Sequence, residues 1–471
     1  MTERPSLAVI GAGPAGLAAT VAAAALGVRV TLLDSAAEAG GQFYRQPASA
    51  LRAGRPQALH HQWRTWEGLR GGLDAQVAAG TVRHLADHHV WLVERRTSPG
   101  AEGFTAHALL GPGQEEPVEV RADAVLLATG GYEKVLPFPG WTLPGVVAAG
   151  GAQAMLKGAL AVSGRTAVVA GTGPLLLPVA TVLAAAGVRV AALVESADPK
   201  AFVRHSRALA AQPGKAAEGA RYAAGLLRHR VRSLVHHTVV EAHGTERLEA
   251  VTVAALDSTG RVRPGTGRRI PCDTLAVGHG MLPHTDLAET LGCRLDGLKV
   301  LVDEEQRTDV PGVWAAGETT GIGGAALSLA EGHIAGRSAA ARLHGTAPDP
   351  RAWTAAAKSR ARLREFAAAL DDVYAPPAHW ADQVTDDTVV CRCEEVTGGA
   401  VREAVTELGA GDLRTVKLLT RAGMGWCQGR VCGPAVAGLA GCALTPSRRP
   451  FALPVPLGVL AHAGESENDD Q

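Results

Sequence analysis

The fold is decided by a stretch near the N-terminus, Leu7–Asp34, which reads LAVIGAGPAGLAATVAAAALGVRVTLLD. A short apolar run precedes a G-x-G-x-x-G loop, and an Ala-rich segment with a helical pattern continues to Leu26. Gly27 ends that helix, and Val28–Leu33 has the composition of a second strand. A strand, a glycine loop, a helix and a strand that ends in an acid together predict a βαβ unit that binds a dinucleotide.

Each residue type in the loop has a physical role in binding a pyrophosphate. Gly11 permits the tight turn, Gly13 lets the backbone approach the phosphates, and Gly16 lets the helix pack closely on the strand. The helix N-terminus adds free N–H groups and a partial positive charge. Asp34 is placed to accept hydrogen bonds from an adenosine ribose. The predicted contacts in this unit are Gly11, Gly13, Pro14, Ala15, Gly16 and Asp34.

Two other interpretations of this stretch are weaker. Residues 5–28 carry no charge and are numerous enough to be mistaken for a membrane span. A secretory signal would need a basic segment and a cleavage site, and neither is clear here. Glycine and proline residues crowded into one turn fit a phosphate-binding loop better than the middle of a helix. We therefore prefer the dinucleotide unit.

The bulk composition bounds the remaining possibilities. The chain has 471 residues, which suggests about three domains, and its 46% hydrophobic content is ample for large cores. The formal net charge is zero, so electrostatics give no case for binding nucleic acid or an anionic membrane. The seven cysteines are an odd number, and no export signal is evident. These two features predict a reducing, cytoplasmic compartment.

Two later segments fit the same dinucleotide-binding domain. Residues 39–46 form a glycine-containing loop that resembles the loop lying along the flavin in two-dinucleotide flavoproteins. This resemblance implies Gly41, Gln42 and Arg45 as candidate flavin contacts, with a plain surface loop as the alternative. Residues 121–130, RADAVLLATG, are predicted to form a buried strand that ends at Thr129 and Gly130, next to the cofactor. The predicted contacts from these segments and from the strand between them are Gly41, Gln42, Arg45, Val90, Thr129 and Gly130.

The middle of the chain repeats the βαβ pattern with one defect. A strand beginning at Thr166 leads into a loop with Gly171 and Gly173, a helix over residues 177–186 follows, and the next strand ends at Glu195. Leu176 takes the place of the third glycine, so we expect the helix to be pushed from the strand and the pyrophosphate cleft to be narrowed. Glu195 favours NAD over NADP. NAD, another adenine nucleotide such as ATP, and an empty site all remain open.

The chain is expected to return to the first domain at Leu275–Gly280 and to complete it at residues 313–343. There a strand, the loop GETTGIGG and a helix over Ala325–Leu343 follow one another. Glu318 is placed to hydrogen-bond the ribityl chain of a flavin, where such domains usually carry Asp. The helix can direct its N-terminal dipole at the flavin ring, where negative charge collects on reduction. The predicted contacts here are Gly317, Glu318 and Ala325.

Residues 5–345 resemble the two-dinucleotide-domain flavoproteins of the glutathione and thioredoxin reductase family. This resemblance implies an α/β fold with two Rossmann-like domains and bound FAD. The chain lacks the redox-active cysteine pair of that family, because no cysteine precedes Cys272. We therefore do not expect disulfide reduction.

A cluster of four cysteines follows a helical connector near the C-terminus. Cys391, Cys393, Cys427 and Cys432 form a C-x-C and a C-x₄-C pair, with 33 residues between the two pairs. Four thiolates can bind zinc or a [2Fe–2S] cluster. The C-x-C spacing favours the cluster over zinc and over free thiols, since structural zinc sites usually separate paired cysteines by two to four residues. Positive charge to compensate the cluster is offered by Arg392, Arg421 and Arg430.

The cysteine segment, with CRCEEVT and TRAGMGWCQGRVC, resembles the bacterioferritin-associated-ferredoxin-like [2Fe–2S] domain. Its fusion to a flavoprotein is similar to the α (A) subunits of hetero-oligomeric amino-acid dehydrogenases. That group includes opine (octopine and nopaline) oxidases, D-hydroxyproline and proline dehydrogenases, sarcosine oxidase-like complexes and hydrogen cyanide synthase. The resemblance implies a separate D-amino-acid-oxidase-like β subunit that oxidises the C–N bond, FMN at a subunit interface, and a small additional subunit.

These observations predict an α/β flavoprotein with a small α-rich [2Fe–2S] domain and no transmembrane segment. The expected units are an FAD domain (1–140 and 272–345), an inserted nucleotide domain (141–271), a connector (346–384), a [2Fe–2S] domain (385–445) and a tail (446–471). The expected function is electron relay from a partner's flavin. The alternatives are a self-sufficient NAD(P)H-dependent reductase and a nucleotide-bound assembly subunit. No acid–base constellation stands out, so the catalytic residues, the amine substrate and the terminal acceptor are not assigned.

Overall fold

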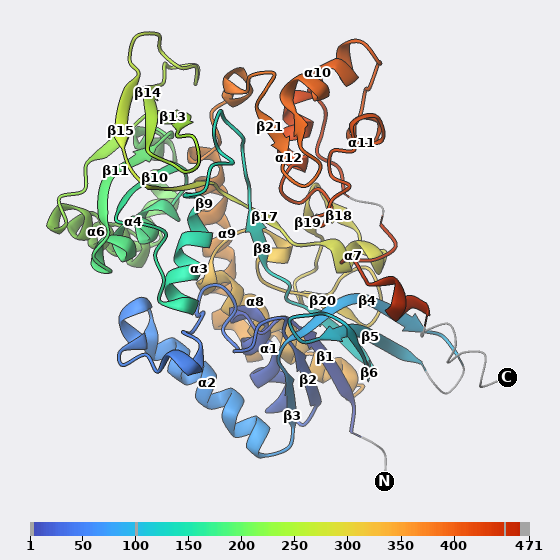
Figure 1. Ribbon diagram of the computed structural model, residues 1–471. Coiled ribbons are helices and arrows are strands. Elements are labelled where there is room, and N and C mark those ends of the chain that lie inside the picture. Colours follow the sequence, from blue (N-terminus) through green and yellow to red (C-terminus); the bar gives the residue numbers. More distant parts are fainter. Residues whose placement is uncertain (1–3, 99–101, 447–448, 462–471) are drawn as a thin grey trace.

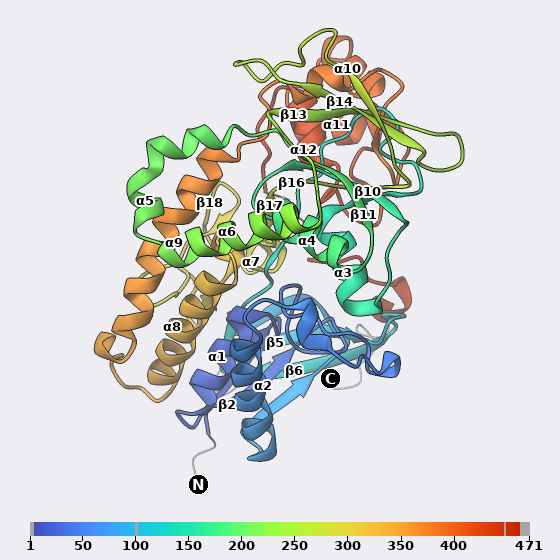
Figure 2. The same ribbon diagram turned by 90° about the vertical axis from the view of Figure 1, so that its left-hand side faces the viewer.

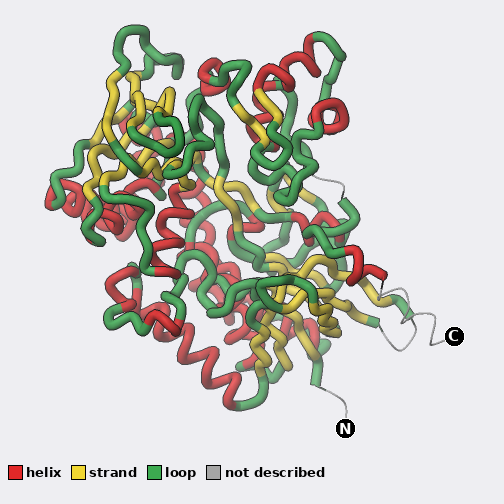
Figure 3. The backbone as a smooth tube through the Cα atoms, viewed as in Figure 1, coloured by secondary structure: helices red, strands yellow, loops and turns green. Residues whose placement is uncertain are grey.

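The computed structural model describes residues 4–98, 102–446 and 449–461 (Figure 1). Most of its strands gather in two separate groups, one for each predicted nucleotide-binding unit, and the cysteine-containing segment forms a third part made of short helices and loops (Figure 3). Within the described ranges, no helix is both long enough and apolar enough to cross a membrane.

The first group is a five-stranded parallel sheet in the order β20-β7-β1-β2-β3. Its strands are β1 (Ser6–Ile10), β2 (Arg29–Leu33), β3 (Val82–Leu85), β7 (Ala124–Leu127) and β20 (Val313–Ala315). Two helices, α1 (Pro14–Ala24) and α8 (Ala325–Leu343), pack closely against each other. Glycines allow this approach, because a Cβ atom at Gly332 or Gly336 of α8 would lie 2.1 or 2.3 Å from a carbonyl oxygen of α1.

A second layer of the first domain is the antiparallel sheet β4-β5-β6. It comprises β4 (His88–Arg96), β5 (Gly103–Leu110) and β6 (Glu116–Ala122). Apolar side chains of this sheet and of β1, β7 and β20 form one buried core. The helix α2 (Trp63–Ala78) packs on the other side, where Trp66 and Leu73 join the core around α1.

The second group is another five-stranded parallel sheet, in the order β12-β11-β10-β16-β9. Its strands are β9 (Val146–Ala148), β10 (Thr166–Thr172), β11 (Arg189–Glu195), β12 (Ser233–Val235) and β16 (Thr274–His279). A three-stranded antiparallel sheet adjoins it: β13 (His237–His243), β14 (Ala250–Ala255) and β15 (Arg268–Pro271). The helices α3 (Ala149–Ala159), α4 (Leu176–Ala185), α5 (Ser206–Ala210) and α6 (Pro213–Arg228) complete this inserted domain.

The structure corrects the expected return to the first domain at residues 275–280. These residues form β16, which pairs with β10 and β9 of the inserted domain. An apolar strand fits the middle of either parallel sheet, so composition alone could not assign it. The return follows at β17 (Met281–Pro283), which pairs with β8 (Gly131–Glu133) in a ribbon between the two domains. Next come the short helix α7 (Asp286–Thr290) and a ribbon of β18 (Leu295–Asp296) and β19 (Lys299–Val300).

The connector contains the long helix α9 (Thr354–Val373), which runs beside α8 and also contacts α5 of the inserted domain (Figure 2). The cysteine module, predicted at residues 385–445, follows with β21 (Val389–Cys391), β22 (Val396–Thr397), α10 (Gly398–Thr406), α11 (Leu413–Thr420) and α12 (Gly433–Leu439). Side-chain caps begin two of these helices. Thr397 accepts a hydrogen bond from the Ala400 N–H at 3.3 Å, and Asp412 accepts one from the Thr415 N–H at 3.0 Å.

The described part of the predicted tail folds back onto the first domain (Figure 1). The Ala452 N–H donates to the carbonyl oxygen of Trp91 at 2.8 Å, and the Phe451 ring meets the Trp91 ring edge-on at 5.0 Å. Of the predicted tail 446–471, residues 447–448 and 462–471 lie outside the described residues.

Candidate functional site

The glycines of the first loop divide into two kinds. Gly11 has a φ of +103°, and a Cβ atom there would lie 2.3 Å from the Ala128 carbonyl oxygen. A Cβ atom at Gly16 would lie 1.8 Å from the Gly11 carbonyl oxygen. Both positions are therefore glycine because the fold requires it. At Gly13 the backbone is extended, with φ −74°, and the atom nearest to an added Cβ is the Gly41 Cα at 3.9 Å. The protein itself does not need glycine there, and a closely approaching ligand would.

Asp34 has a role that the sequence interpretation did not include. Its Oδ2 accepts a hydrogen bond from the Ala12 N–H at 3.0 Å, and its Oδ1 accepts one from the Ala36 N–H at 3.1 Å. Burial raises the pKa of this carboxyl group, and the backbone donors oppose that shift. Asp34 thus fixes the glycine loop in place. A carboxylate has about four acceptor positions, so the predicted ribose contact stays compatible with this arrangement.

The third predicted motif places a half-buried acid beside an open helix N-terminus. Glu318 is surrounded by protein and still partly accessible to solvent, and a Cβ atom at Gly131 would lie 3.6 Å from its Oε2. Burial raises the pKa of Glu318, and the Gly324 N–H opposes that shift. Gly324 precedes α8 with a φ of +79° and no atom within 4 Å of an added Cβ. A carboxylate desolvated in this way favours a hydroxyl donor from a ligand, as the predicted ribityl contact requires.

A second acid holds this loop and was missed from the sequence. Glu331, fully buried on α8, accepts hydrogen bonds from the Gly317 N–H and the Thr320 hydroxyl, both at 2.9 Å. Arg364 of α9 pairs with the other carboxylate oxygen at 2.5 Å. The connector helix is thereby joined to the loop that carries Glu318. A lone acid on the apolar face of a helix was the signal that could have revealed this pair.

The remaining predicted contacts of the first domain lie in different settings. Arg45 donates to Gln42 at 3.1 Å, and a Cβ atom on Gly158 of α3 would lie 3.3 Å from the Arg45 Cδ. This loop thus reaches the inserted domain, where the buried Lys157 donates to the Phe43 carbonyl oxygen at 2.8 Å. The predicted contact Val90 is a core residue of β4. Whether these residues touch a flavin stays a prediction.

The second glycine loop repeats the geometry of the first. Gly171 has a φ of +129°, and an added Cβ would lie 1.7 Å from the Gly278 carbonyl oxygen. Glu195 accepts hydrogen bonds from the Gly173 N–H at 3.2 Å and from the Ala197 N–H at 2.9 Å, as Asp34 does in the first unit. Burial raises the pKa of Glu195 to about 7. Leu176 is only 1% exposed and packs in the core under α4, so the side chain points away from solvent.

A residue from the connector lies at the end of the second loop. The carbonyl oxygen of Tyr374 accepts a hydrogen bond from the Thr172 hydroxyl at 3.5 Å. Burial raises the pKa of Tyr374 to about 12, and the nearby Glu195 carboxylate contributes to that rise. The Phe202 ring meets the Tyr374 ring edge-on at 5.7 Å. Dinucleotides bind at this edge of such sheets, so the chain's own aromatic side chains lie where an adenosine would approach.

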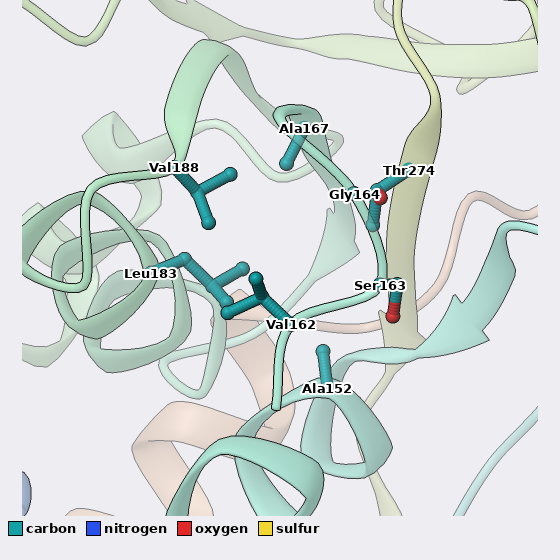
Figure 4. A pocket seen from close by; sticks show the side chains of 8 residues that line it. All are labelled: Ala152, Val162, Ser163, Gly164, Ala167, Leu183, Val188 and Thr274. Carbon is teal, nitrogen blue, oxygen red and sulfur yellow. The ribbon is translucent and has the colours of Figure 1, made fainter. Parts of the chain in front are cut away.

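The hollow shown in Figure 4 lies at the opposite edge of the same sheet. It is lined mainly by small and apolar side chains: Ala152, Val162, Ser163, Gly164, Ala167, Leu183, Val188 and Thr274. Ala167 and Thr274 stand near the beginnings of β10 and β16, whereas ligands of open α/β sheets bind beyond the strand ends. This hollow is therefore not a candidate nucleotide site.

The structure brings the four predicted cysteine ligands together. Cys391 lies beside Cys432, and Cys393 lies beside Cys427. Cys391 and Cys432 are buried and Cys393 is exposed. A Cβ atom at Gly425 would lie 2.1 Å from the Cys393 Cβ, so only glycine allows this approach. The described residues contain no group of three or more metal-binding side chains arranged for a single ion, whereas two thiol pairs suit a two-iron cluster.

The three arginines expected to compensate the cluster all have partners. The Arg392 guanidinium lies over the Trp141 ring, 5.4 Å from its centroid. Arg421 donates to Glu394 at 2.8 Å, and Arg430 pairs with an acid of the first domain. Their charge is therefore already shared with other groups.

Comparison with known proteins follows the same division of the chain. Residues 5–356 match the model of the pyridine nucleotide-disulphide oxidoreductase family. The chain belongs to this family. Residues 389–440 match the BFD-like [2Fe-2S] binding domain, so this oxidoreductase carries an iron–sulfur domain behind its flavoprotein fold. The family, the enzyme class and the fold predicted from the sequence are thus confirmed.

Several relatives of this oxidoreductase match over most of their length. The HcnB subunit of hydrogen cyanide synthase from Pseudomonas protegens is 35% identical over 90% of this chain and 89% of its own. The A subunit of opine oxidase from Agrobacterium tumefaciens is 33% identical over 91% and 84%. The crystal structure of L-proline dehydrogenase from P. horikoshii shares the fold, with a TM-score of 0.66, 21% identity, and coverage of 98% and 81%. The expected FAD and [2Fe–2S] cofactors agree with these matches.

Proposed function

We propose that this chain is the electron-relay subunit of a hetero-oligomeric amino- or imino-acid dehydrogenase. The observation that supports it most is that one chain carries both redox domains in direct contact. Arg430, which lies between Cys427 and Cys432, pairs with Asp286 of the first domain at 2.6 Å. When bound, a flavin can accept two electrons and a [2Fe–2S] cluster accepts one. Together they convert two-electron transfer into one-electron transfer.

The residues of this chain act by binding and positioning. The loop at Gly11–Gly16 and the acid Glu318 would hold FAD, and the two thiol pairs would hold the cluster. The Glu331–Arg364 pair would keep the Glu318 loop rigid, because a buried ion pair strongly resists the loss of either partner. No residue of the chain is assigned to acid–base catalysis, since the proposed C–N oxidation takes place on a partner subunit.

The second nucleotide site is proposed to bind NADH poorly or not at all. The aromatic side chains Tyr374 and Phe202, which lie beside its loop, support this. Leu176, which replaces the third glycine, packs in the core and gives no such support. ATP or another adenine nucleotide is the alternative occupant. The rival function, a self-sufficient NAD(P)H-dependent reductase, is favoured by one observation only: the Gly171–Glu195 unit keeps the hydrogen-bond pattern of the first unit.

The partner is proposed to be a D-amino-acid-oxidase-like β subunit, with FMN at a subunit interface and a small additional subunit. The relatives support the presence of partner subunits, because they are themselves subunits of hydrogen cyanide synthase and of opine oxidase. The type of β subunit, the FMN and the small subunit rest on the resemblance stated from the sequence. The substrate class is accordingly an opine, D-hydroxyproline, proline or related amine.

NADH oxidation by the purified chain with an artificial acceptor separates the functions. If the chain is an electron-relay subunit, the chain alone should oxidise negligible NADH. Once the β subunit is added, the artificial acceptor should be reduced in a substrate-dependent way. Sub-micromolar NADH binding in calorimetric titration, with rapid flavin bleaching, would favour the self-sufficient reductase instead. Parallel titrations of NADPH and ATP would identify what the second site accepts.

A further inference from the structure

A buried charge cluster joins the cysteine loop 427–432 to the first domain. Its centre is Asp286, at the start of α7. Arg430 lies on the cysteine loop, and its Nε and Nη2 approach the Asp286 Oδ2 at 2.8 and 2.6 Å. The Arg449 Nη1 lies 3.6 Å from the other carboxylate oxygen. The three side chains are only 13–17% exposed, so solvent screens their interactions weakly.

The same charge cluster reaches the loops of the predicted flavin site. The His284 Nε2 lies 3.0 Å from the Asp286 Oδ2. The His284 carbonyl oxygen accepts hydrogen bonds from the hydroxyls of Thr129, at 2.6 Å, and Thr319, at 3.0 Å. These two threonines belong to the second and third motifs of the FAD domain.

At its other end the charge cluster contacts the backbone of the cysteine loop. The Arg430 Nη1 donates to the Cys427 carbonyl oxygen at 3.3 Å, and the Arg449 Nη2 donates to the Gln428 carbonyl oxygen at 2.5 Å. A continuous set of contacts therefore runs from the flavin-site threonines through His284 and Asp286 to the carbonyl next to a predicted cluster ligand.

We infer that Asp286 is a positioning residue, which holds the cysteine loop at a fixed place on the flavin domain and sets the local charge at the iron–sulfur centre together with Arg430. Two consequences follow. Without Asp286, two buried guanidinium groups lose their shared partner and the loop is released. Moreover, Asp286 and Arg430 carry opposite charges, so their removal must shift the cluster's reduction potential in opposite directions.

The sign of each shift follows from charge. Reduction adds one negative charge to the cluster, so a more positive surrounding favours the reduced state. Asp286→Asn removes a negative charge and raises the potential. Arg430→Gln removes a positive charge and lowers it. General loosening of the loop would shift the reduction potential of both variants in the same direction.

The first test needs no cofactor. Hydrogen exchange is measured on the cofactor-free full chain, and the peptide covering residues 425–433 is compared between wild type and Asp286→Asn. Breaking a buried pair is expected to accelerate exchange about tenfold or more. The matched control is Asp386→Asn, which breaks the exposed 2.5 Å pair with Arg402 in the same module and should leave this peptide unchanged.

The second test is a redox titration of the loaded protein, followed by paramagnetic resonance. The inference is supported if the reduction potential shifts in opposite directions in Asp286→Asn and Arg430→Gln and does not shift in the Asp386→Asn control. Unchanged exchange in the 425–433 peptide, or potential shifts of the same sign, would overturn it. If Asp286→Asn does not fold, Arg430→Lys takes its place, because lysine keeps the positive charge but cannot make both contacts with Asp286. Exchange in the 425–433 peptide should then accelerate while the potential stays closer to wild type than in Arg430→Gln; equal potential shifts in the two variants would overturn the inference.

This inference rests on the proposed function only for the presence of the cluster. If the exchange and potential shifts occur while no partner delivers electrons, the relay proposal fails and the positioning role stands.

Discussion

Replacement of Gly13 by valine separates binding of FAD from stability of the fold. Gly13 lies in extended backbone with φ −74° and ψ −174°, where any L-residue fits. An added Cβ there finds its nearest atom, the Gly41 Cα, at 3.9 Å, so the protein accommodates a Cβ atom at this position. The lost preference for glycine at a helix N-cap and the lower entropy of the unfolded chain nearly cancel. The stability of the cofactor-free protein should therefore change by no more than about 1 kcal/mol.

A bound pyrophosphate removes that room. Forcing extra carbon atoms into a filled site typically costs about 3 kcal/mol, which corresponds to roughly 100-fold weaker FAD binding. Calorimetric titration of the cofactor-free protein with FAD measures this loss, and thermal unfolding of the same sample measures the stability. A folded Gly13→Val variant that purifies yellow, with full flavin occupancy, would refute the site assignment.

Gly16→Ala is the control for this experiment. Its Cβ would lie 1.8 Å from the Gly11 carbonyl oxygen, so the backbone itself must move. We expect this smaller substitution to lower the unfolding temperature, whereas the larger one at Gly13 does not. Equal effects of the two variants on stability would show that Gly13 is also needed by the fold.

Three further predictions concern other parts of the chain. Cys427→Ser should lose the bound iron and the rhombic paramagnetic signal seen on reduction, while FAD stays bound. Stoichiometric zinc in the wild-type protein, or loss of the flavin together with the iron–sulfur cluster, would contradict the assignment of the four cysteines. Arg364→Ala leaves Glu331 buried without its charge partner, so the free energy of unfolding should fall by about 3 kcal/mol, and the affinity for FAD should fall with it. Denaturant unfolding and FAD titration measure the two effects. An unchanged unfolding midpoint would show that the pair is unimportant. Burial raises the pKa of Glu195 from 4.5 to about 7, so between these values the folded protein holds a proton that the unfolded chain has released. Stability should therefore fall as pH rises through that window, and Glu195→Gln should remove about 3 kcal/mol of this dependence. Parallel pH profiles for the two proteins would contradict the pKa shift.

The sequence was sufficient where local backbone geometry requires one residue type. Gly11 and Gly16 were predicted correctly as structural positions, because a tight turn and a close helix contact admit no side chain. The helix Ala325–Leu343 was predicted with its observed bounds, since a glycine loop precedes it and an apolar pattern continues through it. The four cysteines were predicted to form one group from their spacing alone.

The sequence was insufficient where the outcome depends on contacts between distant segments. β16 fits either sheet by composition, and only its pairing with β10 settles the matter. Asp34 was assigned to a ligand, although its carboxylate also binds the loop. Arg364, Tyr374 and Asp286 carried no local pattern, since their partners lie tens to hundreds of residues away.

The most direct test of the relay account is a rapid-freeze paramagnetic resonance experiment on the complex of this chain with a co-expressed D-amino-acid-oxidase-like subunit. The complex is mixed anaerobically with an opine, proline or D-hydroxyproline. The account predicts that the rhombic signal of the reduced cluster develops with substrate, is lost in Cys427→Ser, and does not develop when NADH is added to the chain alone. A cluster that stays oxidised while the partner's flavin is reduced, or one that NADH reduces in the isolated chain, would contradict it.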